Sequence, residues 1–229
     1  MSSRGRNGVD TVPVDRLSYT ITMRPIIPAR DALASTDPVA ELKTTRLILR
    51  QWRAEDAEPF AALNADPQVM RYLPRLLSRA ESDAFAQAAA ATLRERGFGL
   101  WAVEVAGGSP FIGYVGLNAP SFTAHFTPCV EIGWRLERAS WGAGYASEAA
   151  AQCLRHAFES LALPEVVSFT VPANERSLAV MRRIGMQRDA GGDFEHPRLP
   201  PAHPLRAHVL YRLSAAAWAA RAAAAHAAR

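Results

Sequence analysis

The segment Trp141–Ala146, with the sequence W-G-A-G-Y-A, combines residue types that suit the binding of an anion. Its two glycines allow the backbone to turn sharply and to approach a ligand closely. A helical pattern follows, and a helix N-terminus presents unpaired N–H groups and the positive end of a dipole, which favour a phosphate. A lone G-x-G is more typical of a plain strand-to-helix turn, so the residues around it must decide.

Groups that could transfer protons lie before and after this segment. Glu131 occupies a strand pattern, where partial burial would raise the pKa of its carboxyl towards the range of a general base. A structural ion pair with Arg135, four residues further along the same strand face, is an equally good interpretation. Ser177 could protonate a leaving group, but it is also the third residue of a helix that Asn174 would cap.

The loop Asp189–Pro204 and its surroundings contain alternative candidates. His196 could serve as a base near neutral pH, and so could Glu195, although a histidine beside a proline is equally typical of a turn. Tyr211 is a further candidate acid, but an aromatic residue in a terminal strand is more often part of the core. Asn118 ends its predicted strand and could face a substrate.

Hydrophobic periodicity predicts the strands that would position these residues. Residues Cys129–Leu136 alternate strictly, which puts Glu131 and Arg135 on the face opposite Ile132 and Trp134. Short connections link this strand to two earlier ones, so the three should form an antiparallel meander. The predicted strands are Thr45–Gln51, Phe98–Val105, Phe111–Leu117, Cys129–Leu136, Glu165–Val171, Met186–Arg188 and Arg206–Leu213.

Helical spacing predicts most of the remaining elements. Ser78 begins a capping box with Glu81, and an amphipathic pattern follows the glycines directly. The predicted helices are Arg53–Ala65, a short turn at Pro67–Leu73, Ser78–Arg96, Ala146–Leu161, a helix from Asn174 to Gly185, and the Ala-rich tail 214–229. Residues 1–40 lack sustained periodicity and should be a partly disordered extension, with a short strand at Leu17–Met23.

Length and composition limit the classes of protein. A chain of 229 residues is most simply one domain with extensions at its ends. It has no run of about 18 apolar residues and no visible secretory signal, so we expect a cytoplasmic protein that does not bind membranes. The formal charge of +4 would permit an anionic ligand. No basic run is interleaved with aromatic residues, so nucleic acid is not an expected partner.

Metal and disulfide patterns are weak in this sequence. A metal site would have to draw on Asp193, Glu195, His196 and His203. Their spacing matches no strong ligand motif, so we expect no metal. The two cysteines, Cys129 and Cys153, lie in apolar patterns and should be small buried residues rather than a disulfide framework or nucleophiles.

Four motifs together resemble the GNAT superfamily of acyl-CoA-dependent N-acyltransferases, most closely its Rim-type branch. They are T-R-L-I-L-R, E-I-G-W-R-L, W-G-A-G-Y-A-S-E-A and V-P-A-N-E-R-S-L-A-V-M-R-R-I-G-M, in the order of the family. The resemblance implies a GNAT acetyltransferase domain over residues 41–213. Its fold would be α+β, a single mixed, mostly antiparallel, splayed sheet of about six to seven strands flanked by about four helices.

The resemblance also implies transfer of an acetyl group from acetyl-CoA to a primary amine, which would be a protein N-terminus or a small molecule. The pyrophosphate loop of the family falls on residues 141–146, where Trp141 replaces the usual Gln or Arg. Cofactor contacts would come from Trp134, Arg135, Leu136, Trp141, Gly142, Ala143, Gly144, Tyr145, Ala146, Asn174 and Ser177. The catalytic candidates are Glu131, Ser177 and His196, with a backbone N–H of the strand as oxyanion donor. The protein would be a monomer or a homodimer.

Two other functions match parts of the pattern. G-A-G-Y-A-S nearly matches a dinucleotide-binding motif, but that fold expects a parallel βαβ unit around the glycines and an acidic residue at the end of the next strand. A non-catalytic acyl-CoA-binding sensor would keep the fold and the glycine loop without turnover. The loop Asp189–Pro204 does not decide which amine is the acceptor.

Overall fold

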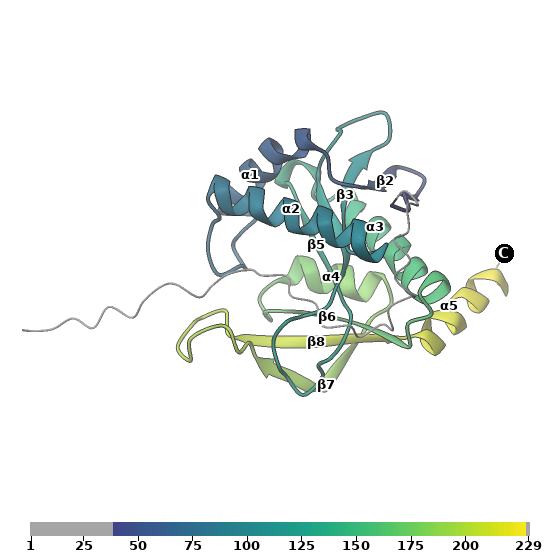
Figure 1. The fold of residues 1–229 in the computed structure, drawn as a ribbon. Coiled ribbons are helices and arrows are strands. Elements are labelled where there is room, and N and C mark those ends of the chain that lie inside the picture. The colour runs from purple at the N-terminus through teal and green to yellow at the C-terminus, as the bar shows by residue number, and fades with distance from the viewer. Residues whose placement is uncertain (1–38, 228–229) are drawn as a thin grey trace, which may run out of the picture.

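The computed structural model describes residues 39–227, which form one sheet with helices on both of its faces (Figure 1). The strand predicted at Leu17–Met23 lies outside the described residues. The strands are β1 (Leu42–Lys43), β2 (Leu47–Arg50), β3 (Leu100–Val105), β4 (Gly113–Asn118), β5 (Glu131–Leu136), β6 (Glu165–Thr170), β7 (Gln187–Glu195) and β8 (Ala207–Ser214). The α-helices are α1 (Ala57–Ala65), α2 (Arg79–Arg96), α3 (Tyr145–Arg155), α4 (Glu175–Arg183) and α5 (Ala215–Ala227). Within residues 39–227, no helix is long and apolar enough to cross a bilayer.

The strands lie in the order β1-β2-β3-β4-β5-β6-β8-β7, and all neighbours are antiparallel except β5 and β6. These two strands are parallel, and in the described part of the chain their register joins Glu131 to Val167 alone. Beyond this pair the sheet splits, and Figure 1 shows β8 running in a different direction from β3 and β5. The predicted α+β class with a mixed, splayed sheet is confirmed, although the described residues form eight strands and five α-helices.

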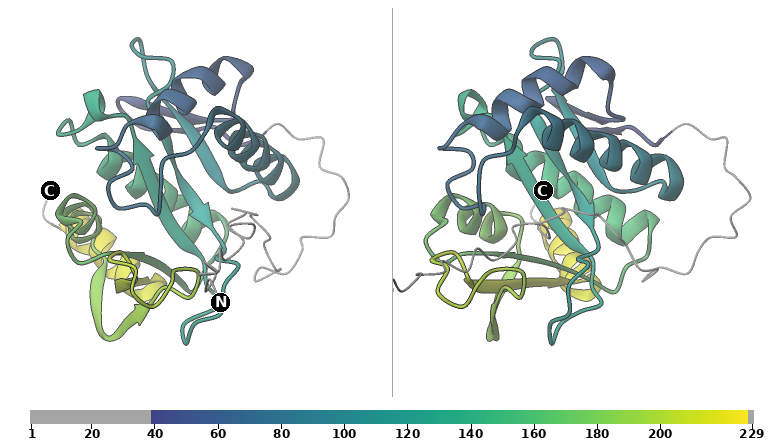
Figure 2. Two further views of the ribbon diagram at one scale, coloured as in Figure 1. Left: turned by 90° about the vertical axis from the view of Figure 1, so that its left-hand side faces the viewer. Right: turned by 60° about the vertical axis from the view of Figure 1, so that its left-hand side comes forward.

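The two faces of the sheet carry different helices, and Figure 2 gives two further views of this arrangement. Tyr114 and Arg135 are register partners on β4 and β5, and Phe85 of α2 stacks on the Tyr114 ring at a centroid distance of 5.5 Å. Trp101 on β3 is paired with the residue after Tyr114, so it faces the other way. There it packs against His156, which follows α3, at a centroid distance of 5.7 Å. Glu131 and Arg135 therefore lie on the α2 face, opposite the face that α3 covers.

Most predicted elements are present, but β1 was not predicted and one predicted strand is longer than expected. The strand predicted at Met186–Arg188 continues to Glu195, through residues that were expected to form a loop. Its register with β8 shifts between Asp189 and Phe194, where a glycine pair interrupts the alternation that identifies a strand in the sequence. The segment predicted as a helical turn at Pro67–Leu73 forms hydrogen-bonded turns that connect α1 to α2. We call this segment the α1–α2 connection.

A side-chain hydroxyl holds β6 against β5 at the point where the backbone pairing stops. The N–H of Val167 donates to the C=O of Val130 at 2.9 Å. Next along the strands, the hydroxyl of Ser168 donates to the C=O of Ile132, also at 2.9 Å. Ser168 is buried, and its hydroxyl donates to the carbonyl that a backbone N–H would bond if the two strands remained paired. The split in the sheet therefore begins at a defined position.

Removing this hydroxyl should destabilise the fold measurably. In Ser168→Ala the carbonyl of Ile132 loses its donor, and we expect the free energy of unfolding to fall by about 1–3 kcal/mol. Ser160→Ala, at an exposed position, is the matched control and should change it by less than about 0.5 kcal/mol. Urea unfolding measures both variants, and equal effects would contradict the role assigned to Ser168.

Candidate active site

A cavity of about 760 Å³ opens where β5 and β6 separate. Residues of β5 and β6 line it, together with the N-terminal turns of α3 and α4 and the α1–α2 connection. We call the part lined by residues of 141–147 the glycine end, and the part lined by residues of 68–73 the connection end. Glu131 and Arg135 also line the cavity, and they belong to the connection end because they share the sheet face that α2 covers.

The backbone of β5 directs polar groups into this cavity. Within a strand, the N–H and C=O groups of alternate residues point to the same side. The carbonyls of Val130 and Ile132 point towards β6, where they bond with Val167 and Ser168. The N–H and C=O groups of Trp134 therefore also point towards β6, into the gap that the separated strands leave. An extended ligand with amide groups could pair with this edge as an added strand does.

The glycine segment forms the predicted turn into a helix. Gly142 and Gly144 have φ angles of +80° and +84°, which L side chains rarely adopt. A Cβ added at Gly142 would meet no atom within 4 Å, so the backbone angle and not the lack of space selects glycine there. Gly144 is the N-cap of α3 and provides no capping side chain, which leaves the first N–H groups of the helix open to a ligand. The segment therefore has the geometry of an anion site.

Trp141 anchors a cation at this end of the cavity. Its indole N–H donates to the C=O of Leu136 at 2.9 Å, which fixes the ring against the end of β5. The guanidinium of Arg176, from the first turn of α4, lies over the Trp141 ring at 4.2 Å from the centroid. Among residues 39–227, no carboxylate lies within ion-pair distance of Arg176, which is exposed and lines the cavity. Sequence reasoning missed this residue because only the fold brings α4 beside Trp141.

Arg46 fastens the glycine segment to the start of the domain. Its guanidinium donates to the C=O of Ala143 at 3.0 Å and forms an ion pair with Glu148 at 2.6 Å. Thr44 also donates to Glu148, at 2.5 Å. Burial raises the pKa of Glu148, but the hydrogen bonds from Thr44 and Arg46 outweigh it and lower the pKa overall. Arg46 of the T-R-L-I-L-R motif therefore holds the glycine turn in place, although the two segments lie far apart in the sequence.

The two polar residues that begin α4 adopt the predicted capping arrangement. Asn174 is the N-cap, and its side-chain oxygen accepts the N–H of Ser177 at 3.4 Å. Its amide also donates to the hydroxyl oxygens of Ser177 at 3.1 Å and of Thr170 at 3.0 Å. Ser177 is half-buried and lines the cavity. Because its hydroxyl oxygen accepts a bond from Asn174, its proton is available for donation into the cavity.

Glu131 lies where the pairing of β5 with β6 ends and the cavity begins. Burial raises the pKa of its carboxyl to about 8, although a hydrogen bond with Asn118 opposes this shift. Asn118 is its register partner on β4, so the amide contact follows from the strand pairing. The alternative prediction, an ion pair with Arg135, is not what forms, because Arg135 donates to Asn64 of α1 at 2.6 Å. A carboxyl group with a raised pKa is a stronger base once it is deprotonated than an ordinary carboxylate is, so Glu131, which lines the cavity, suits a general base that works at mildly alkaline pH.

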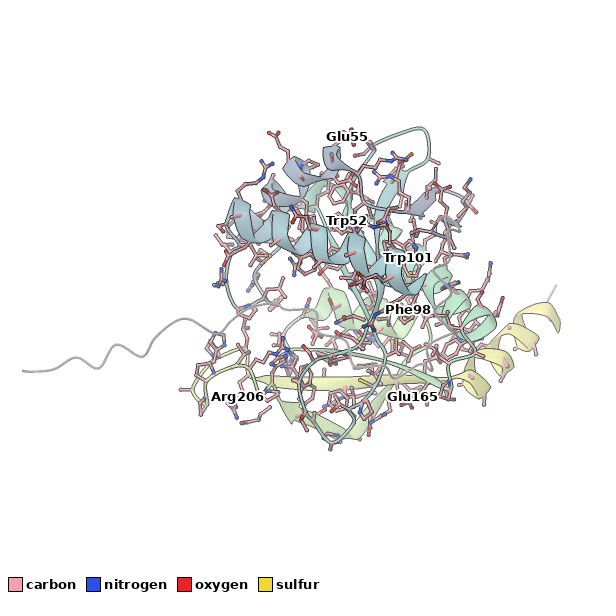
Figure 3. All side chains as sticks on the ribbon, viewed as in Figure 1. Trp52, Glu55, Phe98, Trp101, Glu165 and Arg206 are labelled. Carbon is pink, nitrogen blue, oxygen red and sulfur yellow. The ribbon has the colours of Figure 1, made fainter. Side chains whose placement is uncertain are left out.

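The other predicted acid–base candidates lie apart from the cavity. The His196 ring contacts Phe122 at 4.7 Å and His208 at 5.1 Å between centroids, and burial lowers the pKa of His196 to about 4. Glu195 forms an ion pair with Arg206 at 2.5 Å. Figure 3 labels Arg206 beside the start of β8, well away from Glu165. None of His196, Glu195 and Tyr211 lines the cavity, and Tyr211 is buried in the core.

Cys129 and Cys153 are free and buried, as predicted. Burial raises the pKa of the Cys129 thiol to about 12, and it also raises that of Cys153. Cys129 therefore stays protonated at neutral pH and is a poor nucleophile. In the described residues, no group of three or more histidine, cysteine, aspartate or glutamate side chains could hold a metal ion.

Comparison with known proteins identifies the family. The profile of the acetyltransferase (GNAT) domain matches residues 46–187, which is more than half of the chain. The FsC-acetyl coenzyme A-N(2)-transacetylase of Aspergillus fumigatus is 32% identical over 187 residues, which cover 77% of this chain and 77% of that protein.

Solved structures show the same fold. An acetyltransferase from Agrobacterium tumefaciens is 28% identical, with a TM-score of 0.61 over 77% of this chain and 95% of that one. RimL, a ribosomal L7/L12 α-N-protein acetyltransferase solved in complex with coenzyme A, has a TM-score of 0.61 over 76% of this chain and 98% of that one. At 16% identity, the second likeness shows the fold alone.

The raised pKa of Glu131 should make stability depend on pH. Between about pH 4.5 and 8, folding keeps a proton on Glu131 that the unfolded chain releases. Stability should therefore decrease as pH rises through this window, by at most about 1.4 kcal/mol per pH unit. Urea unfolding of the wild type and of Glu131→Gln, which cannot titrate, should give a difference that shifts in favour of Gln from pH 5 to pH 8. A constant difference would contradict the buried, protonated state.

Proposed function

Since the chain belongs to the acetyltransferase (GNAT) family, which uses acetyl-CoA, we propose that it transfers an acetyl group from acetyl-CoA to a primary amine. The observation that carries this proposal is the gap between β5 and β6, which opens a strand edge beside the N-terminus of α3. Acetyl-CoA has an extended arm with two amide groups and a pyrophosphate, and this pair of features matches the edge and the helix N-terminus.

In this proposal, the cofactor lies along the cavity from the glycine end towards Glu131. The pyrophosphate contacts the backbone N–H groups of residues 142–146, and the guanidinium of Arg176 adds the positive charge that Trp141 does not supply. The amides of the arm bond to the N–H and C=O groups of Trp134 and approach Leu136, in place of a partner strand. Asn174 and Ser177 then face the sulfur end of the arm from α4.

The chemistry follows from the groups around the thioester. Glu131 accepts a proton from the ammonium form of the acceptor, and the freed nitrogen lone pair attacks the thioester carbonyl. A backbone N–H of β5, which we assign to Trp134, stabilises the negative oxygen of the tetrahedral intermediate. The C–S bond then breaks, the cationic nitrogen of the intermediate releases a proton, and the Ser177 hydroxyl relays a proton to the thiolate, directly or by way of water, so that an amide and a thiol result. The products are the acetylated amine and free CoA.

We also propose finer features of this function. Membership of the Rim-type branch rests on the four sequence motifs. His196 is the less favoured base, because it is not among the residues that line the cavity. A non-catalytic sensor would bind acetyl-CoA in the same way, so only turnover distinguishes the two functions.

Release of free thiol from acetyl-CoA, measured with a panel of primary amines, tests the proposal. Turnover with at least one amine is expected. Its rate should increase with pH as Glu131 loses its proton, and the midpoint of this increase should lie near pH 8. Glu131→Gln should lower kcat by about 100-fold or more and remove this pH dependence. Binding without turnover would favour the sensor, and calorimetry without any CoA binding would refute the proposal. An unchanged rate for Glu131→Gln would transfer the role of base to another group.

The assignment of Arg176 has its own test. Arg176→Ala should weaken CoA binding by about threefold to 30-fold, because a charge-assisted contact with a phosphate is lost. The effect should shrink at high salt, since an exposed charge is screened. Arg182→Ala is the matched control, because Arg182 is exposed on the same helix, pairs with Glu175 and does not line the cavity. Calorimetry that gives equal affinities for the two variants would overturn the assignment.

A further inference from the structure

Two arginines line the connection end of the cavity. Arg135 projects from β5 and is 7% exposed, whereas Arg71 lies in the α1–α2 connection and is exposed. Between Glu131 and Arg135 on the same strand face, Gly133 leaves open space, because a Cβ added there would meet no atom within 4 Å. The surface beside the arginine is therefore free to receive part of a ligand.

The partners of Arg135 are all neutral. Its Nη1 donates to the side-chain oxygen of Asn64 at 2.6 Å. The guanidinium also lies over the rings of Phe85 and Tyr114, at 5.7 and 5.4 Å from their centroids. In the described part of the chain, no carboxylate lies within 4.0 Å of the guanidinium of Arg135 or of Arg71. A buried cation usually has an anionic partner, so the fold leaves room for one to arrive with a ligand.

We propose that the acceptor amine carries a carboxylate, which the connection end binds through the guanidinium groups of Arg135 and Arg71. This inference rests on the proposed acetyl transfer and names the class of acceptor for the same cavity. A guanidinium matches a carboxylate in shape and can donate two parallel hydrogen bonds to it. An amino acid or a peptide with an acidic group near its N-terminus belongs to this class.

The same charges disfavour amines with several positive groups. Glu131 is the one carboxyl group among the residues that line the connection end, and burial raises its pKa to about 8. At neutral pH this end therefore contains two arginine charges and little negative charge. A polyamine or an aminoglycoside would bring further cations without meeting carboxylates, so it should bind weakly.

Matched acceptor pairs test the inference. Thiol release from acetyl-CoA would be measured with L-leucine against L-leucinamide, γ-aminobutyrate against its amide, and Ala-Asp amide against Ala-Asn amide, with spermidine as the polycation. In at least one pair, kcat/KM should be about tenfold or more higher for the carboxylate. Spermidine should be slower than that carboxylate. Equal or inverted ratios in all three pairs, or spermidine as the best acceptor, would overturn the inference but leave acetyl transfer itself intact.

Variants identify the groups that bind the carboxylate. Arg71→Gln, at an exposed position that should not affect folding, is expected to lower the carboxylate-to-amide ratio of kcat/KM about threefold or more, because the carboxylate loses a charged partner. Arg135→Lys should lower the same ratio further, and its urea midpoint shows whether it is folded. Arg138→Gln is the control, because Arg138 is exposed nearby but does not line the cavity.

Three outcomes would count against carboxylate recognition, and they show whether acetyl transfer fails as well. An unchanged ratio in Arg71→Gln and in folded Arg135→Lys would mean that Arg135 is held by its aromatic neighbours for stability only, and would refute the inference. CoA binding without turnover of any acceptor would also count against it. Absence of CoA binding would refute the proposed function as well, so the two failures can be told apart.

Discussion

In residues 39–227 the parallel strands β5 and β6 share a single register pair, and the geometry of the cavity depends on this limit. Up to Glu131 the two strands belong to one sheet; beyond it, β5 stays with β4 while β6 stays with β8. The backbone of a strand has two hydrogen-bonding edges, and an edge that faces neither strand nor water is costly. Ser168 satisfies the first carbonyl past the division, and the groups of Trp134 remain available to a ligand. The cavity therefore forms because two strands inside the sheet stop pairing, and not because small side chains leave a space.

The division also explains why residues from distant parts of the sequence meet. Because α3 crosses from the end of β5 to the start of β6, its N-terminus must lie at the open side of the gap. The helix α4 follows β6 directly, so its first turn faces the same gap from the other half of the sheet. The stacking of Arg176 on Trp141 joins these two helix starts. Two helix N-termini and the guanidinium of Arg176 thus face one strand edge and concentrate positive potential there, beside the exposed Glu175 of the first turn of α4.

Sequence reasoning could predict the parts of the site that depend on local pattern. The alternation around Glu131 gives its sheet face, and Asn174 is recognisable as a cap from its position before an amphipathic helix. It could not predict contacts that depend on how elements pack, such as the bond from Arg135 to Asn64, which forms in place of the ion pair with Glu131 that was one of two alternatives. The extension of β7 to Glu195 was hidden for a different reason: the strand is paired through a register shift, and a shifted strand has no regular alternation to detect.

The distribution of paired and unpaired arginines separates structural from functional charge. Arg50 and Arg212 lie outside the cavity, and each contacts two carboxylates, at distances of 2.7–2.8 Å. This chain has nearly as many acidic as basic residues, with 22 against 26, so partners for arginine are not scarce. Two of the arginines that line the cavity nevertheless rest on aromatic rings, as Arg176 does on Trp141 and Arg135 does on Tyr114. An aromatic face holds a guanidinium in position without neutralising it, so the charge stays available to an anion. The same device at both ends of one cavity is what a site needs when its two substrates both bring negative charge.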